Sequence, residues 1–262
     1  MARAGGGSAM TVRLSIVGLM KRFGGVVASD NVTLDFAPGS LTAVIGPNGA
    51  GKTTFFNLIS GKLKPDAGQI LLDGVDIAGR SQSEIVRRGI GRAFQVASIF
   101  PRFTVEEALT AAVLTHRQQT SSMLRRFPLP LALARAREIM ALAGLERVAS
   151  TPSRFLSHGD QKLLDIALAL ALEPKVLLLD EPTAGMGPEE RWQMIERVQT
   201  LWREVGMTLV FIEHDMDIVF KIAQTIRVLR YGKVLAEGTP DEIRSNADVI
   251  EAYLGTSLEA SA

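Results

Sequence analysis

The chain has 262 residues, of which 47% are hydrophobic, so it is long enough for one large domain or two small ones with a packed core. It contains no cysteine, which excludes a disulfide framework and a thiolate metal site. Its formal net charge of +1 gives no reason to expect nucleic-acid binding. No apolar run approaches the roughly 20 residues of a membrane-spanning helix. Residues 1–10 lack the apolar stretch of a signal peptide and are expected to form a disordered tail.

Two stretches near the start of the chain alternate apolar and polar side chains. Residues 12–17 place Val, Leu and Ile at every second position, and residues 32–36 do the same with Val, Leu and Phe. A period of two predicts half-buried strands, so this part is expected to form an antiparallel layer. Between the strands, Phe23 precedes a pair of glycines. Its ring is suited to stacking on an adenine base, and the alternative is that it packs in the core.

The loop that follows residues 41–45 is the strongest motif of the chain. This short, mainly apolar run predicts a buried strand, and residues 55–60 continue as a helix. Between them the sequence fits G-x-x-x-x-G-K-[ST], in which glycines and a helix N-terminus direct backbone N–H groups at a phosphate. Lys52 is expected to reach the β- and γ-phosphates, and the Thr53 hydroxyl to ligate Mg²⁺. The predicted phosphate-binding residues are Gly46, Pro47, Asn48, Gly49, Ala50, Gly51, Lys52, Thr53 and Thr54.

A polar residue stands where the next predicted strands give way to an irregular stretch. Residues 69–72 predict a strand and residues 83–88 a short helix. Gln95 follows them and is expected to sense the γ-phosphate or to complete the Mg²⁺ shell. The alternative is that Gln95 is an ordinary polar residue at a strand end.

The middle of the chain, about residues 96–160, is predicted to be a helical subdomain inserted into an α/β core. Thr104 and Glu107 have the spacing of a capping box at the start of a helix. Residues 116–130 are polar, basic and interrupted by prolines, which predicts a loop. Residues 131–143 are rich in Ala, Leu and Arg, which predicts a second helix.

Two apolar strands in the second half of the chain end in charged residues. In the strand predicted at residues 175–181, an apolar run leads into Asp180 and Glu181, and the strand predicted at residues 207–212 is followed closely by His214. Buried parallel strands have such continuous apolar runs, and ligands bind at their carboxyl ends. Asp180 is expected to hold the water shell of Mg²⁺, and Glu181 to polarise an attacking water. His214 is expected to contact the γ-phosphate, the alternative being a structural role.

The remaining motifs are a helix start and a terminal hairpin. Residues 156–162, with the sequence LSHGDQK, precede an apolar helix that Pro174 ends. Residues 226–236 predict a hairpin around a Tyr-Gly turn, and short helices are predicted from residues 240 and 248.

Taken in order, these motifs resemble the ATPase subunit of ABC transporters, over about residues 10–254. The stretches that carry the likeness to one branch, the branched-chain amino acid transport ATPases, are GPNGAGKTTFFNLISG, LLLDEPTAGM, IEHDM and EGTPDEIRSNADVIEAYLG. That branch also includes subunits for urea, amides and aromatic acids. The resemblance implies a P-loop NTPase (RecA-like) core with an antiparallel β layer and an inserted helical subdomain. The ATPase domain is expected to span residues 11–255, followed by a tail of residues 256–262.

The resemblance also implies partners. Two subunits, as a homodimer or a close heterodimer, would sandwich two ATP molecules head to tail, with Ser157 and Gly159 of one subunit on the γ-phosphate held by the other. Transmembrane permease subunits would dock on the helical subdomain, at the cytoplasmic face of the inner (plasma) membrane. An extracytoplasmic solute-binding protein would deliver the solute. The residues expected to form the docking surface are Phe100, Pro101 and Phe103, unless they pack within the subdomain.

Three positions depart from the family pattern. His158 stands where glycine is usual, Asp160 where glutamine is usual, and Gly187 where many relatives have aspartate. A carboxylate at position 160 would repel a phosphate unless it points away as a residue of the helix N-terminus. These departures affect communication across the dimer rather than nucleotide binding.

Three other functions compete with an amino-acid importer. An ATPase of lipopolysaccharide or phospholipid export has a similar short C-terminal tail, but the IEHDM stretch favours the amino-acid branch. A soluble ABC protein acting on ribosomes or DNA would carry paired cassettes or long coiled coils, whereas this sequence has one P-loop and no heptads. A regulator that does not hydrolyse ATP would not need Glu181 and His214. The transported solute is not encoded in this subunit, because the solute never touches it.

Overall fold

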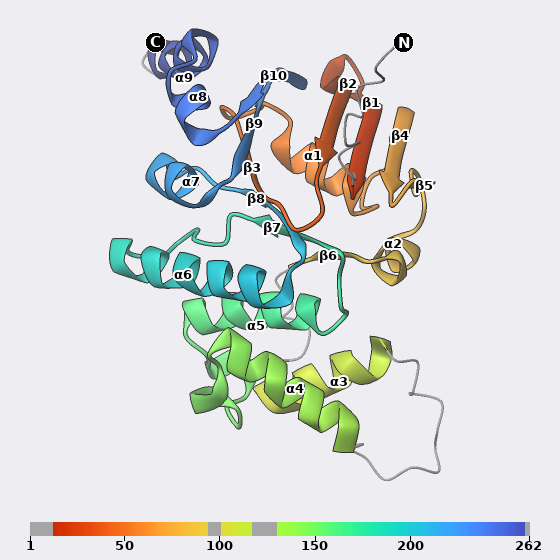
Figure 1. Ribbon diagram of the computed structural model, residues 1–262, viewed down its shortest axis with the longest axis vertical. Coiled ribbons are helices and arrows are strands. Elements are labelled where there is room, and N and C mark those ends of the chain that lie inside the picture. Colours follow the sequence, from red (N-terminus) through yellow and green to blue (C-terminus); the bar gives the residue numbers. More distant parts are fainter. Residues whose placement is uncertain (1–12, 94–100, 117–129, 260–262) are drawn as a thin grey trace, which may run out of the picture.

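The computed structural model describes residues 13–93, 101–116 and 130–259, which form two sheets and a block of helices (Figure 1). The expected tail of residues 1–10, Gln95 and Phe100 lie outside these ranges. No helix of the described residues has the length and apolar composition needed to cross a membrane.

The first sheet is the expected antiparallel layer. Its strand order is β2-β1-β4-β5, with the bounds β1 (Leu14–Phe23), β2 (Val26–Phe36), β4 (Ala67–Leu72) and β5 (Val75–Asp76). The first strand is longer than the expected residues 12–17, because Phe23 still pairs with Val26 across the turn to β2. Phe23 therefore ends a strand rather than lying in a loop between strands.

The second sheet has six strands in the order β10-β9-β3-β8-β7-β6. Neighbouring strands from β9 to β6 are parallel, and only the terminal hairpin β9–β10 is antiparallel. The third strand has the predicted bounds, residues 41–45. The strands are β3 (Leu41–Ile45), β6 (Ile90–Arg92), β7 (Val176–Asp180), β8 (Thr208–Ile212), β9 (Thr225–Arg230) and β10 (Lys233–Gly238).

The helices cover both faces of this mixed sheet. One helix, α1, lies between it and the antiparallel layer, and the others pack on the opposite face, at its edges or below it (Figure 1). They are α1 (Lys52–Ile59), α2 (Gln82–Arg88), α3 (Val105–His116), α4 (Pro130–Ala143), α5 (His158–Leu170), α6 (Pro188–Val205), α7 (Met216–Ile222), α8 (Pro240–Arg244) and α9 (Ala247–Glu259).

Two apolar cores hold the mixed sheet between them, and its strands alternate between the two. In β8, Leu209 and Phe211 belong to the core beneath α5 and α6, whereas Val210 and Ile212 belong to the core beneath α1. Every residue of β3 and β8 is buried, because both faces of these strands are covered. This double burial is why each of their sequences is apolar except for one threonine.

The helical block shares a core with the sheet. Side chains of α3, α4 and α5, among them Leu109, Ile139 and Leu164, belong to the same apolar cluster as β3 and β7. The predicted capping box at the start of α3 is confirmed: the Thr104 N–H donates to Glu107 Oε2 (2.8 Å), and the Glu107 N–H donates to Thr104 Oγ1 (3.2 Å). The block is thus an elaboration of one face of the α/β core.

Two helices were not predicted. The 18 residues of α6 include a charged exposed face, and its buried stripe consists of Met194, Ile195, Val198 and Leu201. Gly187 and Pro188 begin this helix, and Gly206 ends it with a left-handed backbone (φ 68°). The short helix α7 begins after Asp215, whose carboxylate accepts from the N–H groups of the first turn. At the C-terminus, α9 runs through Glu259, into the segment expected to be a tail.

The first glycine of the phosphate-binding loop is packed against a strand, which gives a prediction about stability. Gly46 has φ 152°, and a Cβ there would lie 2.1 Å from the Leu229 carbonyl oxygen. Gly49 in the same loop also has positive φ (77°), but a Cβ there would meet nothing within 4 Å. We expect Gly46→Ala to lower the free energy of unfolding by about 3–4 kcal/mol and Gly49→Ala by about 1–2 kcal/mol, as measured by urea unfolding without nucleotide. Equal effects of the two variants would show that the contact with Leu229 is easily relieved.

Candidate functional site

The loop between β3 and α1 has the features of an anion-binding site. α1 begins at Lys52, directly after Gly51, whose left-handed backbone (φ 100°) turns the chain into the helix. No side chain caps this helix start, and its first turn contains no acidic residue. The first N–H groups of the helix and the positive end of its dipole therefore face the loop, which suits a phosphate group.

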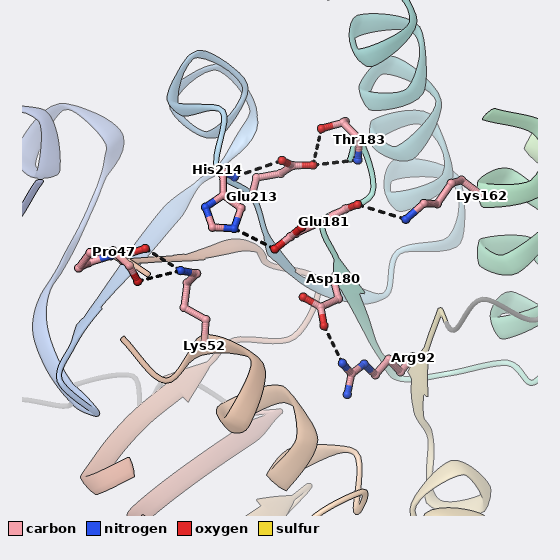
Figure 2. Close-up of polar contacts among 10 residues, drawn as sticks. Pro47, Lys52, Arg92, Lys162, Asp180, Glu181, Thr183, Glu213 and His214 are labelled. Carbon is pink, nitrogen blue, oxygen red and sulfur yellow. Dashed lines mark hydrogen bonds and ion pairs between the residues drawn. The ribbon is translucent and has the colours of Figure 1, made fainter. Parts of the chain in front are cut away.

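Lys52 carries the cation of this loop. Its ammonium donates to the carbonyl oxygens of Gly46 (2.6 Å) and Pro47 (3.1 Å), so it is folded back over the loop, as Figure 2 shows. The residue is only 7% exposed. Burial lowers the pKa of the Lys52 ammonium, and the nearby carboxylates of Glu181 and Asp180 oppose that shift. A positive charge is thus held at the centre of the loop, next to two negative ones.

Asp180 stands at the carboxyl end of β7. Its side chain is 22% exposed, and its Oδ2 accepts a hydrogen bond of 2.6 Å from Arg92 Nη2 (Figure 2). β7 is the neighbour of β8, and β8 is the neighbour of β3, so the parallel pairing brings Asp180 to the sheet edge from which the phosphate-binding loop begins. The sequence did not identify Arg92, because the residue follows a glycine in a three-residue strand with no motif of its own.

Glu181 and His214 form a hydrogen-bonded pair. His214 Nε2 lies 2.8 Å from Glu181 Oε1, with the two side chains 49% and 41% exposed. Glu181 has a left-handed backbone (φ 50°), and its N–H donates to the Ile212 carbonyl (3.0 Å). Such a conformation costs on the order of 1–3 kcal/mol outside glycine and is concentrated at functional sites. With this backbone, the Glu181 carboxylate reaches His214, two residues after the end of β8.

A buried carboxylate, also missed from the sequence, fixes the turn after Glu181. Glu213 is 4% exposed, and its Oε1 accepts from the N–H (3.0 Å) and the hydroxyl (2.7 Å) of Thr183. Its Oε2 accepts from the N–H of His214 (3.2 Å). Figure 2 shows these bonds joining the segment after β7 to the segment after β8. The orientation of Glu181 relative to His214 therefore rests on Glu213. The sequence signal that could have identified Glu213 is its position directly before His214.

One cavity gathers most of the predicted site. It is lined by residues 48–54, by Glu181 and His214, and by residues 26–28 at the start of β2. Phe23 pairs with Val26 at the turn between β1 and β2 and is 47% exposed. An exposed ring disfavours the alternative that Phe23 packs in the core. Its stacking on a base remains a prediction.

The residues of the LSHGDQ stretch do not line the cavity of the phosphate-binding loop. Ser157 caps α5, its hydroxyl accepting from the Asp160 N–H (3.1 Å), and both residues line a second cavity together with Gly159. Asp160 points inwards: it is 5% exposed, and its carboxylate accepts from Arg147 Nη2 (2.5 Å) and from the Ser157 hydroxyl (2.8 Å). Asp160 therefore points away from the place expected for a phosphate, as the sequence analysis required of a carboxylate at this position. A single chain does not bring Ser157 and Gly159 into the cavity of Lys52.

The donor set at the sheet edge fits a magnesium ion. Among the described residues no group of three or more His, Asp or Glu side chains is arranged to hold a metal. Mg²⁺ in nucleotide sites takes one or two protein oxygens, and its other ligands are phosphates and waters. The exposed hydroxyl of Thr53 and the carboxylate of Asp180 are hard oxygen donors of this kind, and the contribution of Gln95 falls outside the described residues.

Comparison with known proteins gives the class to which this fold and site belong. Residues 29–184 match the family described as ABC transporter. Since this match covers more than half of the chain, the chain belongs to the ATP-binding cassettes of ABC transporters, a family that binds and hydrolyses ATP.

The C-terminal segment narrows the class to one branch. Residues 233–259 match the family described as branched-chain amino acid ATP-binding cassette transporter. The high-affinity branched-chain amino acid transport ATP-binding protein LivG of Escherichia coli (strain K12) is 40% identical over 250 residues, which cover 92% of this chain and 97% of LivG. The resemblance seen in the sequence motifs is thereby confirmed.

Solved structures share the fold. A crystal structure of the ADP conformation of an ATP-binding cassette of an ABC transporter matches with a TM-score of 0.82 and 30% identity, over 93% of this chain and 99% of that one. A dimeric structure of a post-hydrolysis state of such a cassette, bound to ADP and Pi, matches with a TM-score of 0.72 and 26% identity, over 87% and 98% of the two chains. The predicted P-loop NTPase fold is confirmed.

The position of the Lys52 ammonium predicts the effect of its removal. Lys52→Ala should weaken ATP binding by about 2–4 kcal/mol, or roughly 30- to 1,000-fold, because charge-assisted bonds to the phosphates are lost. The matched control is Lys64→Ala, which removes an exposed lysine after the same helix. Isothermal titration calorimetry with ATP measures both. Normal ATP affinity in Lys52→Ala would contradict the role given to this loop.

Proposed function

We propose that the chain is the ATP-hydrolysing subunit of an importer for branched-chain amino acids or a related small solute such as urea, an amide or an aromatic acid. The observation that carries the catalytic part is the convergence of Lys52 and the Glu181–His214 pair on one cavity. The solute class is supported by the C-terminal segment, residues 233–259, and by the likeness to LivG.

Each side chain has a proposed role during hydrolysis. Lys52 and the N–H groups at the start of α1 bind the β- and γ-phosphates of ATP. Glu181 accepts a proton from the attacking water, and the bond from His214 to its Oε1 orients the carboxylate for that transfer. Thr53 and Asp180 would hold Mg²⁺, which supplies neutralisation of the phosphate charge when bound.

The second half of each ATP site is proposed to come from another subunit. Ser157 and Gly159 line a cavity of their own, with Arg147 and Glu190, and not the cavity of the P-loop. A head-to-tail homodimer, or a heterodimer with a close relative, places Ser157 at the γ-phosphate bound by the opposite chain. The dimeric cassette bound to ADP and Pi, which shares this fold, supports the arrangement.

Membrane subunits are proposed to dock on the helical block, which places the protein on the cytoplasmic face of the inner membrane. Phe103 is 41% exposed and Phe155 is 66% exposed, so part of each side chain faces solvent. The two lie in adjacent segments, because the Ser153 N–H donates to the Phe103 carbonyl (2.9 Å). Exposed aromatic rings on neighbouring segments favour contact with transmembrane permease subunits. An extracytoplasmic binding protein would deliver the solute to those subunits.

The dimer and the base are tested together by Glu181→Gln. A glutamine cannot accept the proton, so ATP hydrolysis should fall by about 10²–10⁴-fold while ATP binding is retained. The lost negative charge should also favour the closed dimer. Size-exclusion chromatography with ATP and Mg²⁺ should show Glu181→Gln as a dimer, and the wild type with ADP as a monomer.

Two controls accompany this variant. Glu204→Gln, an exposed position near the end of α6, should behave as the wild type. Adding Ser157→Arg to Glu181→Gln should abolish the dimer, because a long cation at the start of α5 blocks the sandwich. Hydrolysis by Glu181→Gln at the wild-type rate would exclude Glu181 as the base.

The docking surface is tested by cysteine crosslinking in the assembled transporter. The sequence has no native cysteine, so Arg102→Cys introduces a single thiol on an exposed residue next to Phe103. We expect it to crosslink to a cysteine in a cytoplasmic loop of the permease. Glu251→Cys, on the exposed side of α9, should give no such product. Crosslinks from position 251 alone would move the docking surface to the C-terminal helices.

A further inference from the structure

Arg92 connects the two elements that carry the proposed magnesium ligands. Its guanidinium donates through Nη2 to Asp180 Oδ2 (2.6 Å) and through Nη1 to Asn57 Oδ1 (2.7 Å) and Ser60 Oγ (3.2 Å). Asp180 ends β7, whereas Asn57 and Ser60 lie in α1 and at its C-terminal cap. A single side chain thus joins the helix of the phosphate-binding loop to the acidic end of the neighbouring strand.

The position of Asn57 makes this connection relevant to the metal. Asn57 follows Thr53 by four residues in α1, so the two side chains lie one turn apart on the same side of the helix. Arg92 therefore holds Asp180 from the turn of α1 directly behind Thr53. The two oxygen donors proposed for Mg²⁺ are set relative to each other by this bridge.

The bridge is buried and has several partners. The side chain of Arg92 is 7% exposed, and its guanidinium carbon lies 5.9 Å from the ring centroid of Phe56, which is fully buried. Ser60, one of its acceptors, donates in turn to the Phe56 carbonyl (2.8 Å). The planar fork of arginine spans two sites in fixed directions, which a lysine ammonium on a flexible stem does not.

A second explanation is that Arg92 serves only as the counter-ion of Asp180. In that case its charge would compete with Mg²⁺ for the carboxylate, and its removal would strengthen metal binding. A counter-ion needs no bonds to two neutral acceptors on another element. The contacts to Asn57 and Ser60 therefore favour a geometrical role.

We propose that Arg92 is a positioning residue that fixes Asp180 relative to Thr53 and so preassembles the Mg²⁺ site. The proposal rests on the roles proposed above for Thr53 and Asp180. It adds the structural reason why the two donors, which are 127 positions apart in the sequence, act on one ion.

The test separates geometry from charge by measuring how much Mg²⁺ strengthens ATP binding. The quantity is the ratio of ATP affinity with Mg²⁺ to that with EDTA, from calorimetry on the purified full-length protein. Arg92→Lys keeps the charge and removes the fork, and should reduce the ratio roughly 10-fold or more, as loss of a ligand-orienting partner does in metal sites. ATP affinity in EDTA should change less than about threefold, because Lys52 and its loop are untouched. Asn57→Ala keeps Arg92 itself and should reduce the ratio in the same direction.

Controls make each outcome decisive. Arg13→Lys alters another arginine paired with an aspartate, Arg13 with Asp73 (2.5 Å), in the antiparallel layer and should leave the ratio unchanged. Asp180→Asn should abolish the enhancement.

A ratio in Arg92→Lys equal to or above the wild-type value would overturn the proposal and leave Arg92 as a counter-ion. If Arg92→Lys does not fold, Asn57→Ala decides alone, and an unchanged ratio in Asn57→Ala overturns the proposal. If Asp180→Asn retains the full enhancement, the role of Asp180 in the proposed function is wrong and the inference falls with it.

Discussion

Parallel pairing of three buried strands is the constraint on which the site depends. β3, β8 and β7 lie side by side and run in the same direction, with Val44 and Asp180 both paired to Ile212. Their carboxyl ends therefore meet along one edge of the sheet, where the phosphate-binding loop, the acidic pair and the histidine begin. Apolar cores on both faces hold this alignment. A shift of one strand by a single residue would exchange the side chains of the two cores and move the site apart.

At that edge of the sheet, the segments are held together by hydrogen bonds rather than by apolar contacts. A buried carboxylate is costly unless its oxygens are satisfied, and Glu213 receives three hydrogen bonds from two neighbouring segments. Arg92 likewise donates hydrogen bonds to both α1 and β7. These bonds keep the strained backbone of Glu181 in place. The buried side chains of Glu213 and Arg92 thus hold neighbouring segments together, whereas the more exposed side chains of Glu181 and His214 face the cavity.

The sequence was sufficient for those parts of the fold that depend on local pattern. The continuous apolar run of β3 and the glycine loop after it predicted the phosphate site, and the acid pair after β7 predicted its partner. The predicted length of β1 was wrong, because the true length depends on pairing with β2 rather than on alternation within residues 12–17. Contacts such as Arg92 with Asp180, separated by 88 positions, have no local signature. The same holds for the inward turn of Asp160, which requires Arg147 from a separate short helix.

The bond between Ser157 and Asp160 has a consequence for the energetics of a working cycle. The Ser157 hydroxyl already donates its proton to a carboxylate whose charge is balanced by Arg147. To donate to a phosphate instead, the hydroxyl must give up one charge-assisted bond for another, so the net gain is the small difference between two similar interactions. A subunit contact built on such an exchange is weakly favoured in either direction. In the proposed dimer, such a balance would let the two subunits separate as readily as they associate.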